Sequence, residues 1–160
     1  MNELHQYFSA ERQAGLFALL LGVASIAAAI YLWSARSPFQ AAAWPLVVFG
    51  LIEAGVGAAL VMRTPSQVQA LDAGFTTTAQ ATATAERQRM TRVNQTFRLI
   101  MAGEVALIML GTGLAFFLRT RNTTWAAIGM ALLLHAAVLL VFDIVAEHRA
   151  HAYSRWLASS

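Results

Sequence analysis

The sequence contains no cysteine, no lysine and few charged residues of any kind. Without cysteine there can be no disulfide, no thiolate nucleophile and no thiolate metal ligand. Only 12% of the 160 residues are charged and 58% are hydrophobic, whereas a soluble domain has about 25% charged and about 45–50% apolar residues. The excess of apolar side chains must face something other than water, and a lipid bilayer is the environment that fits.

Long apolar runs with few interruptions predict four membrane spans. A helix needs about 20 apolar residues to cross about 30 Å of hydrocarbon. The runs are continuously apolar rather than alternating, which argues against a β-barrel. We therefore predict an all-α, membrane-embedded four-helix bundle, built as two α-hairpins in a single domain over 1–160. Its spans are expected at 15–35, 44–62, 99–118 and 125–145.

The connection between the second and third spans, 63–98, is the only sizeable segment outside the membrane. Its apolar and small residues recur mostly at steps of three and four, the helical period, which predicts a cytoplasmic helical arm. Thr64 is a candidate N-cap, followed by Pro65 and by a Gln that would complete a capping box. Residues 76–85 are rich in Thr and Ala, and both helix and loop are consistent with them. A further cytoplasmic helix is expected over 146–160.

The distribution of arginine predicts the orientation, because basic residues accumulate on the cytoplasmic side. Eight arginines lie on the side that holds both termini and the middle connection: Arg12, Arg63, Arg87, Arg89, Arg92, Arg98, Arg149 and Arg155. Three lie on the other side: Arg36, Arg119 and Arg121. Both termini should therefore be cytoplasmic, in a bacterial inner membrane. Aromatic residues at the span ends are typical of interfacial belts: Trp33, Trp44 and Trp125 outside, and Tyr7, Phe8, Tyr153 and Trp156 inside.

Two polar residues lie near the midplane of the predicted bilayer. A carboxylate there costs about 2.5–3.5 kcal/mol, so such residues mark a function or a structural partner. Glu53 lies nine residues after Trp44, and His135 lies ten after Trp125. At about 1.5 Å per residue their depths match, which predicts a Glu53–His135 contact. The contact is either a relay for protons or cations, or a bond that fixes the register of the helices.

Two further carboxyl groups lie nearer the cytoplasmic face. Glu104 has no basic residue expected at its depth, so it should be protonated, face an aqueous crevice or meet a partner protein. Asp143 lies at the level of Arg63 and Arg98, which favours an interfacial salt bridge. It also begins a stripe at steps of four, which is either a solvated face or, less simply, a divalent metal site: Asp143, Glu147, His151 and Arg155.

Small residues accompany the polar groups inside the membrane. Gly50 and Gly57 share a helix face with Glu53, and Gly111 lies on the Glu104 side of its helix. Small residues let helices approach closely, so we predict tight packing, with a substrate cavity as the alternative. Each hairpin also begins its second helix with an outer Trp and places a polar residue mid-helix. This likeness is consistent with an internal duplication and equally with the general similarity of α-hairpins.

No motif in the sequence indicates catalysis. The HExxH, GxSxG and phosphate-loop patterns are absent, and no pair of histidines within the spans could hold a haem. The net charge of +3 is too small and too dispersed for a nucleic-acid interface. We therefore expect neither an enzyme, nor a cofactor or bound metal, nor a nucleic-acid partner.

The layout of the whole chain resembles that of small four-span bacterial inner-membrane proteins. Among these are immunity proteins that guard a cell against pore-forming or membrane-inserting toxins. The resemblance implies helix–helix interaction within the membrane with another membrane-active protein, and it assigns no residue roles. The alternative is a small oligomeric ion channel, or a proton- or cation-coupled transporter, that uses Glu53, Glu104 and His135. The expected partners are the bilayer, a second membrane protein and further copies of the chain.

Overall fold

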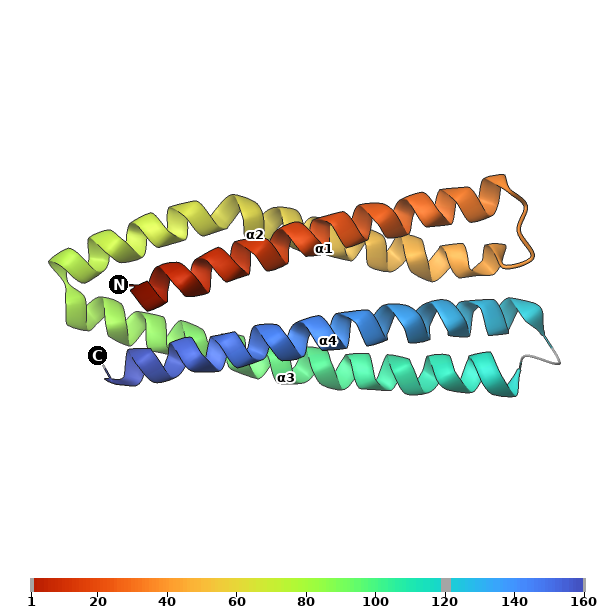
Figure 1. Ribbon diagram of the computed structural model, residues 1–160. Helices are drawn as coiled ribbons and strands as arrows, with labels where there is room; N and C mark the ends of the chain where they lie inside the picture. The colour runs from red at the N-terminus through yellow and green to blue at the C-terminus, as the bar shows by residue number, and fades with distance from the viewer. Residues whose placement is uncertain (1, 119–121, 160) are drawn as a thin grey trace.

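The computed structural model describes residues 2–118 and 122–159. Within them the chain is all-α, with four long helices and one short 3-10 turn that pack as two hairpins, α1 with α2 and α3 with α4. Figure 1 shows an elongated molecule in which the two hairpins lie side by side and both chain ends lie at one end. The elements are α1 (Asn2–Ser34), η1 (Gln40–Ala42), α2 (Ala43–Thr77), α3 (Ala79–Phe117) and α4 (Thr123–Ser159).

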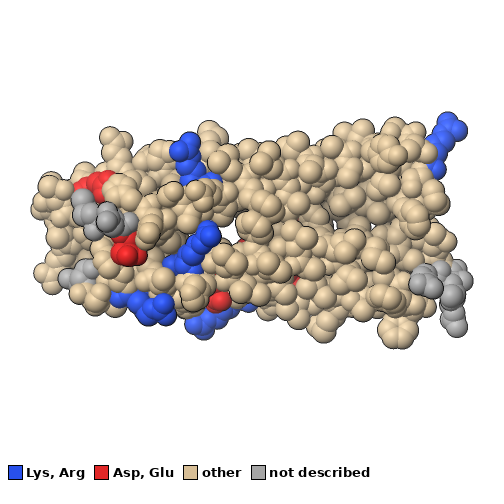
Figure 2. Space-filling model, in the orientation of Figure 1, with Lys and Arg blue, Asp and Glu red and all other residues tan. Residues whose placement is uncertain are grey.

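All four helices are long and apolar enough to cross a membrane. Each predicted span lies within one helix, apart from the last residue of the first span and of the third. By helix length and hydropathy, the protein is a multi-pass membrane protein. Figure 2 shows that most charged side chains of this face gather toward the end that holds the termini and that few lie along the rest of it.

The first hairpin is held by a row of residues at seven-residue steps on each helix. Seven residues are close to two helical turns, so this spacing keeps one narrow face on the partner helix. A Cβ atom on Gly50 would lie 2.8 Å from the carbonyl oxygen of Gly22, so the two backbones are almost in contact. The buried rows are Phe8, Gly15, Gly22 and Ala29 on α1, and Ala43, Gly50, Gly57 and Thr64 on α2.

The second hairpin has a similar close contact between its helices, but one position of the buried row on α3 is occupied by a carboxyl group. Gly111 of α3 meets α4 so closely that an added Cβ would lie 2.7 Å from the carbonyl oxygen of Gly129. Seven residues from Gly111 on the same face, the buried residue is Glu104, and seven residues from Gly129 it is Ala136. The side chain of Glu104 is therefore enclosed within a helix–helix contact rather than turned to the lipid.

The middle connection is helical on both sides of a single break at Thr78. Its backbone (φ −140°, ψ 57°) ends α2 and begins α3. The Thr78 N–H donates to the carbonyl of Gly74 at 2.8 Å. A Cβ on Gly74 would lie 2.7 Å from Oγ1 of Thr82, so the reversal needs glycine there. The arm left open as helix or loop over 76–85 is thus a helical hairpin with a one-residue turn.

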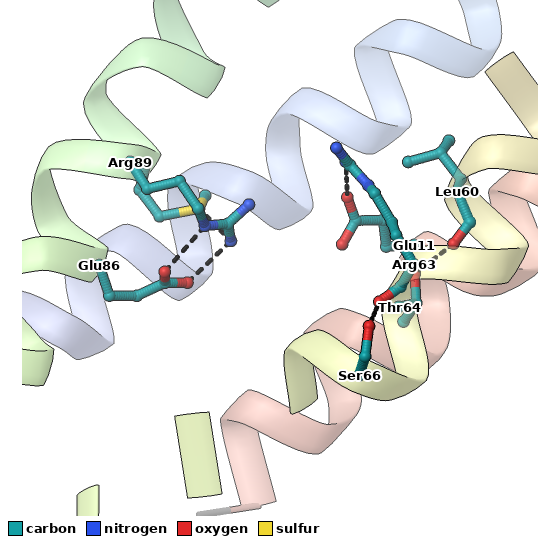
Figure 3. Close-up of polar contacts among 8 residues, drawn as sticks. Glu11, Leu60, Arg63, Thr64, Ser66, Glu86 and Arg89 are labelled. Carbon is teal, nitrogen blue, oxygen red and sulfur yellow. Dashed lines mark hydrogen bonds and ion pairs between the residues drawn. The ribbon is translucent and has the colours of Figure 1, made fainter. Parts of the chain in front are cut away.

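The predicted helix start at Thr64 is wrong, because α2 runs through Pro65 without a break. Proline lacks the N–H that would bond the carbonyl four residues earlier, and it usually bends a helix. Hydroxyl groups on both sides bond the backbone of the same turn (Figure 3). Thr64 Oγ1 donates to the carbonyl of Leu60 at 2.6 Å, and Ser66 Oγ donates to that of Arg63 at 2.8 Å. The buried Thr64 is therefore part of the helix contact and not a cap.

Candidate functional site

A hydrogen bond deep inside the protein joins the two hairpins. His135 Nε2 of α4 lies 2.6 Å from Glu53 Oε1 of α2. Only 5% of Glu53 and 7% of His135 is exposed. The ring of Phe49 stacks on the imidazole at 5.1 Å and covers one of its faces. The contact expected from the matching depths of the two residues is present, and it links separate hairpins.

This pair can hold a proton in two ways. Either the imidazole N–H donates to a carboxylate, or a carboxylic acid donates to the imidazole nitrogen. The other carboxyl oxygen of Glu53 is buried and has no hydrogen-bond partner among the described residues. The pair therefore retains one unused acceptor, which a proton or an entering donor group could occupy. A proton can move between the partners without a change in their positions.

Glu104 is not alone, contrary to the prediction. The carboxyl group of Asp143 on α4 lies close enough to interact with that of Glu104, while Oε2 of Glu104 is buried and has no hydrogen-bond partner among the described residues. Two carboxylates are both acceptors, so a hydrogen bond between them requires a proton on one of the two. The sequence argument considered only basic partners at the depth of Glu104, and a second acid satisfies the group equally well. The second hairpin thus contains a carboxyl pair that can share a proton.

The salt bridge predicted between Asp143 and Arg63 or Arg98 is also wrong. Arg63 Nη2 lies 3.0 Å from Glu11 Oε1, which joins α2 to α1 instead (Figure 3). Asp143 has turned inward to Glu104 and makes no ion pair with a described residue. Asp143 belongs to the contact between α3 and α4, because it lies seven residues after Ala136, which itself lies seven residues after Gly129.

Beyond Asp143 the stripe on α4 behaves as a solvated face. His151 Nε2 lies 3.5 Å from Glu147 Oε1, an exposed pair at a spacing of four residues. Among residues 2–118 and 122–159 no three His, Asp or Glu side chains gather closely enough to hold a metal ion. The stripe predicted from the sequence therefore contributes paired surface charge at the end of the molecule that holds the termini.

An apolar cavity of about 450 Å³ reaches His135 from the opposite end of the molecule, where the α1–α2 connection lies. It opens between the hairpins, and Figure 2 shows gaps along the same line. His135 is the one lining residue with a titratable side chain. The glycines for which the sequence offered a substrate cavity as the alternative, Gly50, Gly57 and Gly111, do not line this cavity, and its use for a substrate stays a prediction. Its lining comprises Leu21, Phe39, Ala42, Leu46, Ala115, Ala126, Ala127, Met130, Ala131, Leu134, His135 and Val138.

A polar and aromatic cluster at the end of the molecule that holds the termini was not foreseen. Arg89 makes two hydrogen bonds, of 2.7 and 2.8 Å, to the buried carboxylate of Glu86 (Figure 3). The rings of Tyr7 and Tyr153 stack at 4.5 Å, and Arg89 lies over the ring of Phe8. The aromatic residues predicted to face the membrane interface therefore form a core here. The signal was the three-residue spacing of Glu86 and Arg89, which places them on one helix face.

The burial of this cluster changes the proton affinity of its members. Burial, reinforced by the nearby carboxylate of Glu11, raises the pKa of Tyr7 to about 12. Burial and then the charge of Glu86 raise the pKa of Tyr153 well above its ordinary value. Burial alone would lower the pKa of Arg89, but the hydrogen bonds to Glu86 outweigh it and raise that pKa. The cluster thus combines the hydrogen bonds between Glu86 and Arg89 with two phenols whose pKa values are raised.

Replacing Tyr7 with phenylalanine should reduce the loss of stability at alkaline pH. The unfolded chain releases the Tyr7 proton near its ordinary pKa of 10.0 and the folded chain near 12. The unfolded state therefore binds fewer protons between these values, and stability falls as pH rises from about 10 to 12. Thermal unfolding in detergent at several pH values measures the fall. Tyr31→Phe is the control, since Tyr31 is exposed; an unchanged fall in Tyr7→Phe would contradict the assignment.

No protein-family model, curated protein or solved structure matches this chain. The four helices and their two buried proton-sharing pairs therefore carry the functional argument.

Proposed function

We propose that this protein is a small proton-coupled transporter that exchanges protons for a lipophilic cation. The observation that carries the proposal is that His135 makes two contacts at once. Its imidazole bonds the buried carboxyl of Glu53 at 2.6 Å and also lines the cavity that opens between the hairpins. A group that holds a proton and at the same time faces a solute-sized space can couple the two.

The chemistry of the pair favours exchange over co-transport. A proton on His135 and a cation in the cavity would repel each other at short range in a medium of low dielectric constant. Either positive charge can be balanced by the carboxylate of Glu53, but both together cannot. The cavity wall is apolar, which suits a cation with an organic surface and would not replace the water around a small hydrated ion.

The carboxyl pair of Glu104 and Asp143 supplies a second exchangeable proton nearer the inner end. Asp143 lies eight residues from His135 on α4, or about 12 Å along the helix. This spacing allows a stepwise proton route with one pair at each depth. Four helices enclose little space, so assembly of several copies in the membrane accompanies the proposal.

The interaction function, with a membrane-inserting toxin as partner, has lost its main support. It rested on Glu104 as a carboxyl group without a partner inside the chain. Asp143 supplies a partner for Glu104 inside the chain, although Oε2 of Glu104 is buried and has no hydrogen-bond partner among the described residues. What remains is the exposed apolar surface, and contact with lipid explains that surface. No observation calls for an enzymatic role.

The uptake of tetraphenylphosphonium, a lipophilic cation, into proteoliposomes with an acidic interior tests the proposed function. Vesicles that contain the protein should accumulate the probe beyond protein-free vesicles at the same pH gradient. The excess should vanish when nigericin, with equal potassium concentrations on both sides, collapses the pH gradient without creating a membrane potential. Uptake equal to that of protein-free vesicles at every gradient would reject proton-coupled transport of this solute class.

We place the protein in a bacterial inner membrane with both termini in the cytoplasm, on the strength of the eight-to-three arginine asymmetry. Arg119 and Arg121 of that count lie outside the described residues. Reporter fusions after residue 160 should be active only with cytoplasmic reporters, and fusions within 36–43 only with periplasmic ones. A periplasmic reporter that is active at the C-terminus would reverse the orientation.

A further inference from the structure

Three exposed arginines lie where the apolar surface meets the charged end of the molecule. Arg12 belongs to α1, Arg98 to α3 and Arg149 to α4. Figure 2 shows arginine atoms at several places near the charged end of this face. These residues take no part in the two buried pairs, so they need an explanation of their own.

Two contacts between helices fix the level of these arginines. The stacked rings of Phe17 and Phe142 align α1 with α4. Arg12 lies five residues inward from that contact and Arg149 seven, a difference of about 3 Å along the axis. Asn94 Nδ2 donates to Ser154 Oγ at 3.1 Å and aligns α3 with α4. Arg98 lies four residues and Arg149 five residues outward from this hydrogen bond. The backbone positions of all three arginines are therefore at nearly the same level along the long axis of the molecule.

These three side chains have no partner in the part of the chain that the structure describes. Among the described residues, the guanidinium groups of Arg12, Arg98 and Arg149 make no ion pair or hydrogen bond. Other arginines of the same half are satisfied, for example Arg63 by Glu11 and Arg87 by the carbonyl of Leu157. Arg92 and Arg155 are also exposed and have no side-chain partner among the described residues, but each lies six residues, or about 9 Å, farther from the apolar surface than Arg98 and Arg149. Arg12, Arg98 and Arg149 are therefore the unpaired arginines of this half that lie nearest the apolar surface.

Exposed apolar residues lie immediately outward from each of these arginines. They are Leu16 on α1, Leu99 on α3 and Val145 on α4. Each is within one helical turn of its arginine. A ligand that meets both residues must combine an anionic group with a hydrocarbon chain, and the two parts must be joined at the level of the membrane surface.

We propose that Arg12, Arg98 and Arg149 bind the phosphate groups of anionic phospholipids in the inner leaflet. Guanidinium groups bind phosphate oxygens in pairs, and the neighbouring apolar side chains contact the acyl chains of the same lipids. Free phosphate would gain nothing from those apolar contacts. The selection of anionic lipid fixes the depth of the bundle and is independent of any transport activity.

The test compares two triple variants that remove the same charge. One is R12Q/R98Q/R149Q, and the control is R36Q/R92Q/R155Q, which changes exposed arginines at other levels. Each arginine near an anionic surface contributes about fivefold to binding, so the first variant should lose on the order of 100-fold in affinity for phosphatidylglycerol. The control should stay near the affinity of the unmodified protein. Native mass spectrometry of detergent-solubilised protein, titrated with phosphatidylglycerol or phosphatidylcholine, measures the difference.

The unmodified protein provides a second readout that needs no variant to fold. Its preference for phosphatidylglycerol over phosphatidylcholine should weaken as sodium chloride is raised, because salt screens exposed charges. Two results would overturn the proposal. One is an absent or salt-independent preference in the unmodified protein, and the other is an equal loss of affinity in both triple variants.

Discussion

Glu53→Gln should reduce proton-driven uptake of tetraphenylphosphonium to the level of protein-free vesicles. Glutamine keeps the shape of the side chain and can still hydrogen-bond His135, but it cannot balance the charge of a proton or of a cation. The buried position, with 5% of Glu53 exposed, leaves no water to take over that role. Stability should change by only about 1 kcal/mol, because one hydrogen bond replaces another.

Glu11→Gln is the matched control for this variant. It makes the same chemical change at a carboxylate that also has a basic partner, Arg63 at 3.0 Å, but lies away from the cavity. Uptake by Glu11→Gln should resemble that of the unmodified protein. If Glu53→Gln transports fully while its unfolding midpoint drops, the Glu53–His135 bond is a structural link between the hairpins and nothing more.

The midplane pair could be foreseen because straight helices convert sequence distance into depth. Counting from Trp44 and Trp125 brought Glu53 and His135 to one level, and the two are bonded at 2.6 Å. The count could not say which helices are neighbours, since four helices can be arranged in several ways. The predicted contact already joined the second and fourth spans, which belong to different hairpins, and the structure confirms it. That His135 also lines a cavity follows only from the packed structure.

The partner of Glu104 could not be foreseen by a search for opposite charges. Two acids satisfy each other through one shared proton, so their attraction does not appear in a list of charged residues. Asp143 also seemed committed to an arginine at its own level, whereas a side chain near a span end can turn inward. Asp143 could point outward to an arginine or inward to Glu104. It points inward because it follows Gly129 and Ala136 in a seven-residue row that faces the neighbouring helix.

The bends of the arm escaped prediction for a related reason. Thr64, Pro65 and Gln67 have the composition of a helix start, and only the tertiary context keeps α2 continuous there. Thr64 is buried and its hydroxyl donates to the carbonyl of Leu60 in the preceding turn, so it serves within the helix instead of capping a new one. At Thr78 the reversal needs a single residue outside the helices, which is too short to leave a turn signature in a Thr- and Ala-rich segment.

Gly57→Ala should destabilise the protein by about 1–3 kcal/mol, the usual cost of overpacking a close contact, whereas Gly55→Ala should be neutral or slightly stabilising. A Cβ on Gly57 would lie 2.5 Å from the carbonyl oxygen of Gly15 and 2.9 Å from Cα of Leu19. These are backbone atoms, so relief requires α1 and α2 to move apart.

The two glycines lie on the same helix two residues apart, so the two variants differ mainly in whether the added Cβ meets α1. A Cβ on Gly55 would meet nothing within 4 Å, so that substitution only adds the helix propensity of alanine, worth up to about 1 kcal/mol. Both effects can be measured by unfolding the purified protein in mixed micelles of increasing dodecyl sulfate content. Gly50 belongs to the same row on α2 as Gly57, and Gly22 belongs to the facing row on α1. Separation of the helices at Gly57 should therefore loosen the whole first hairpin. Equal stabilities of the two variants would mean that the helices of the first hairpin do not approach as closely as their glycine row indicates.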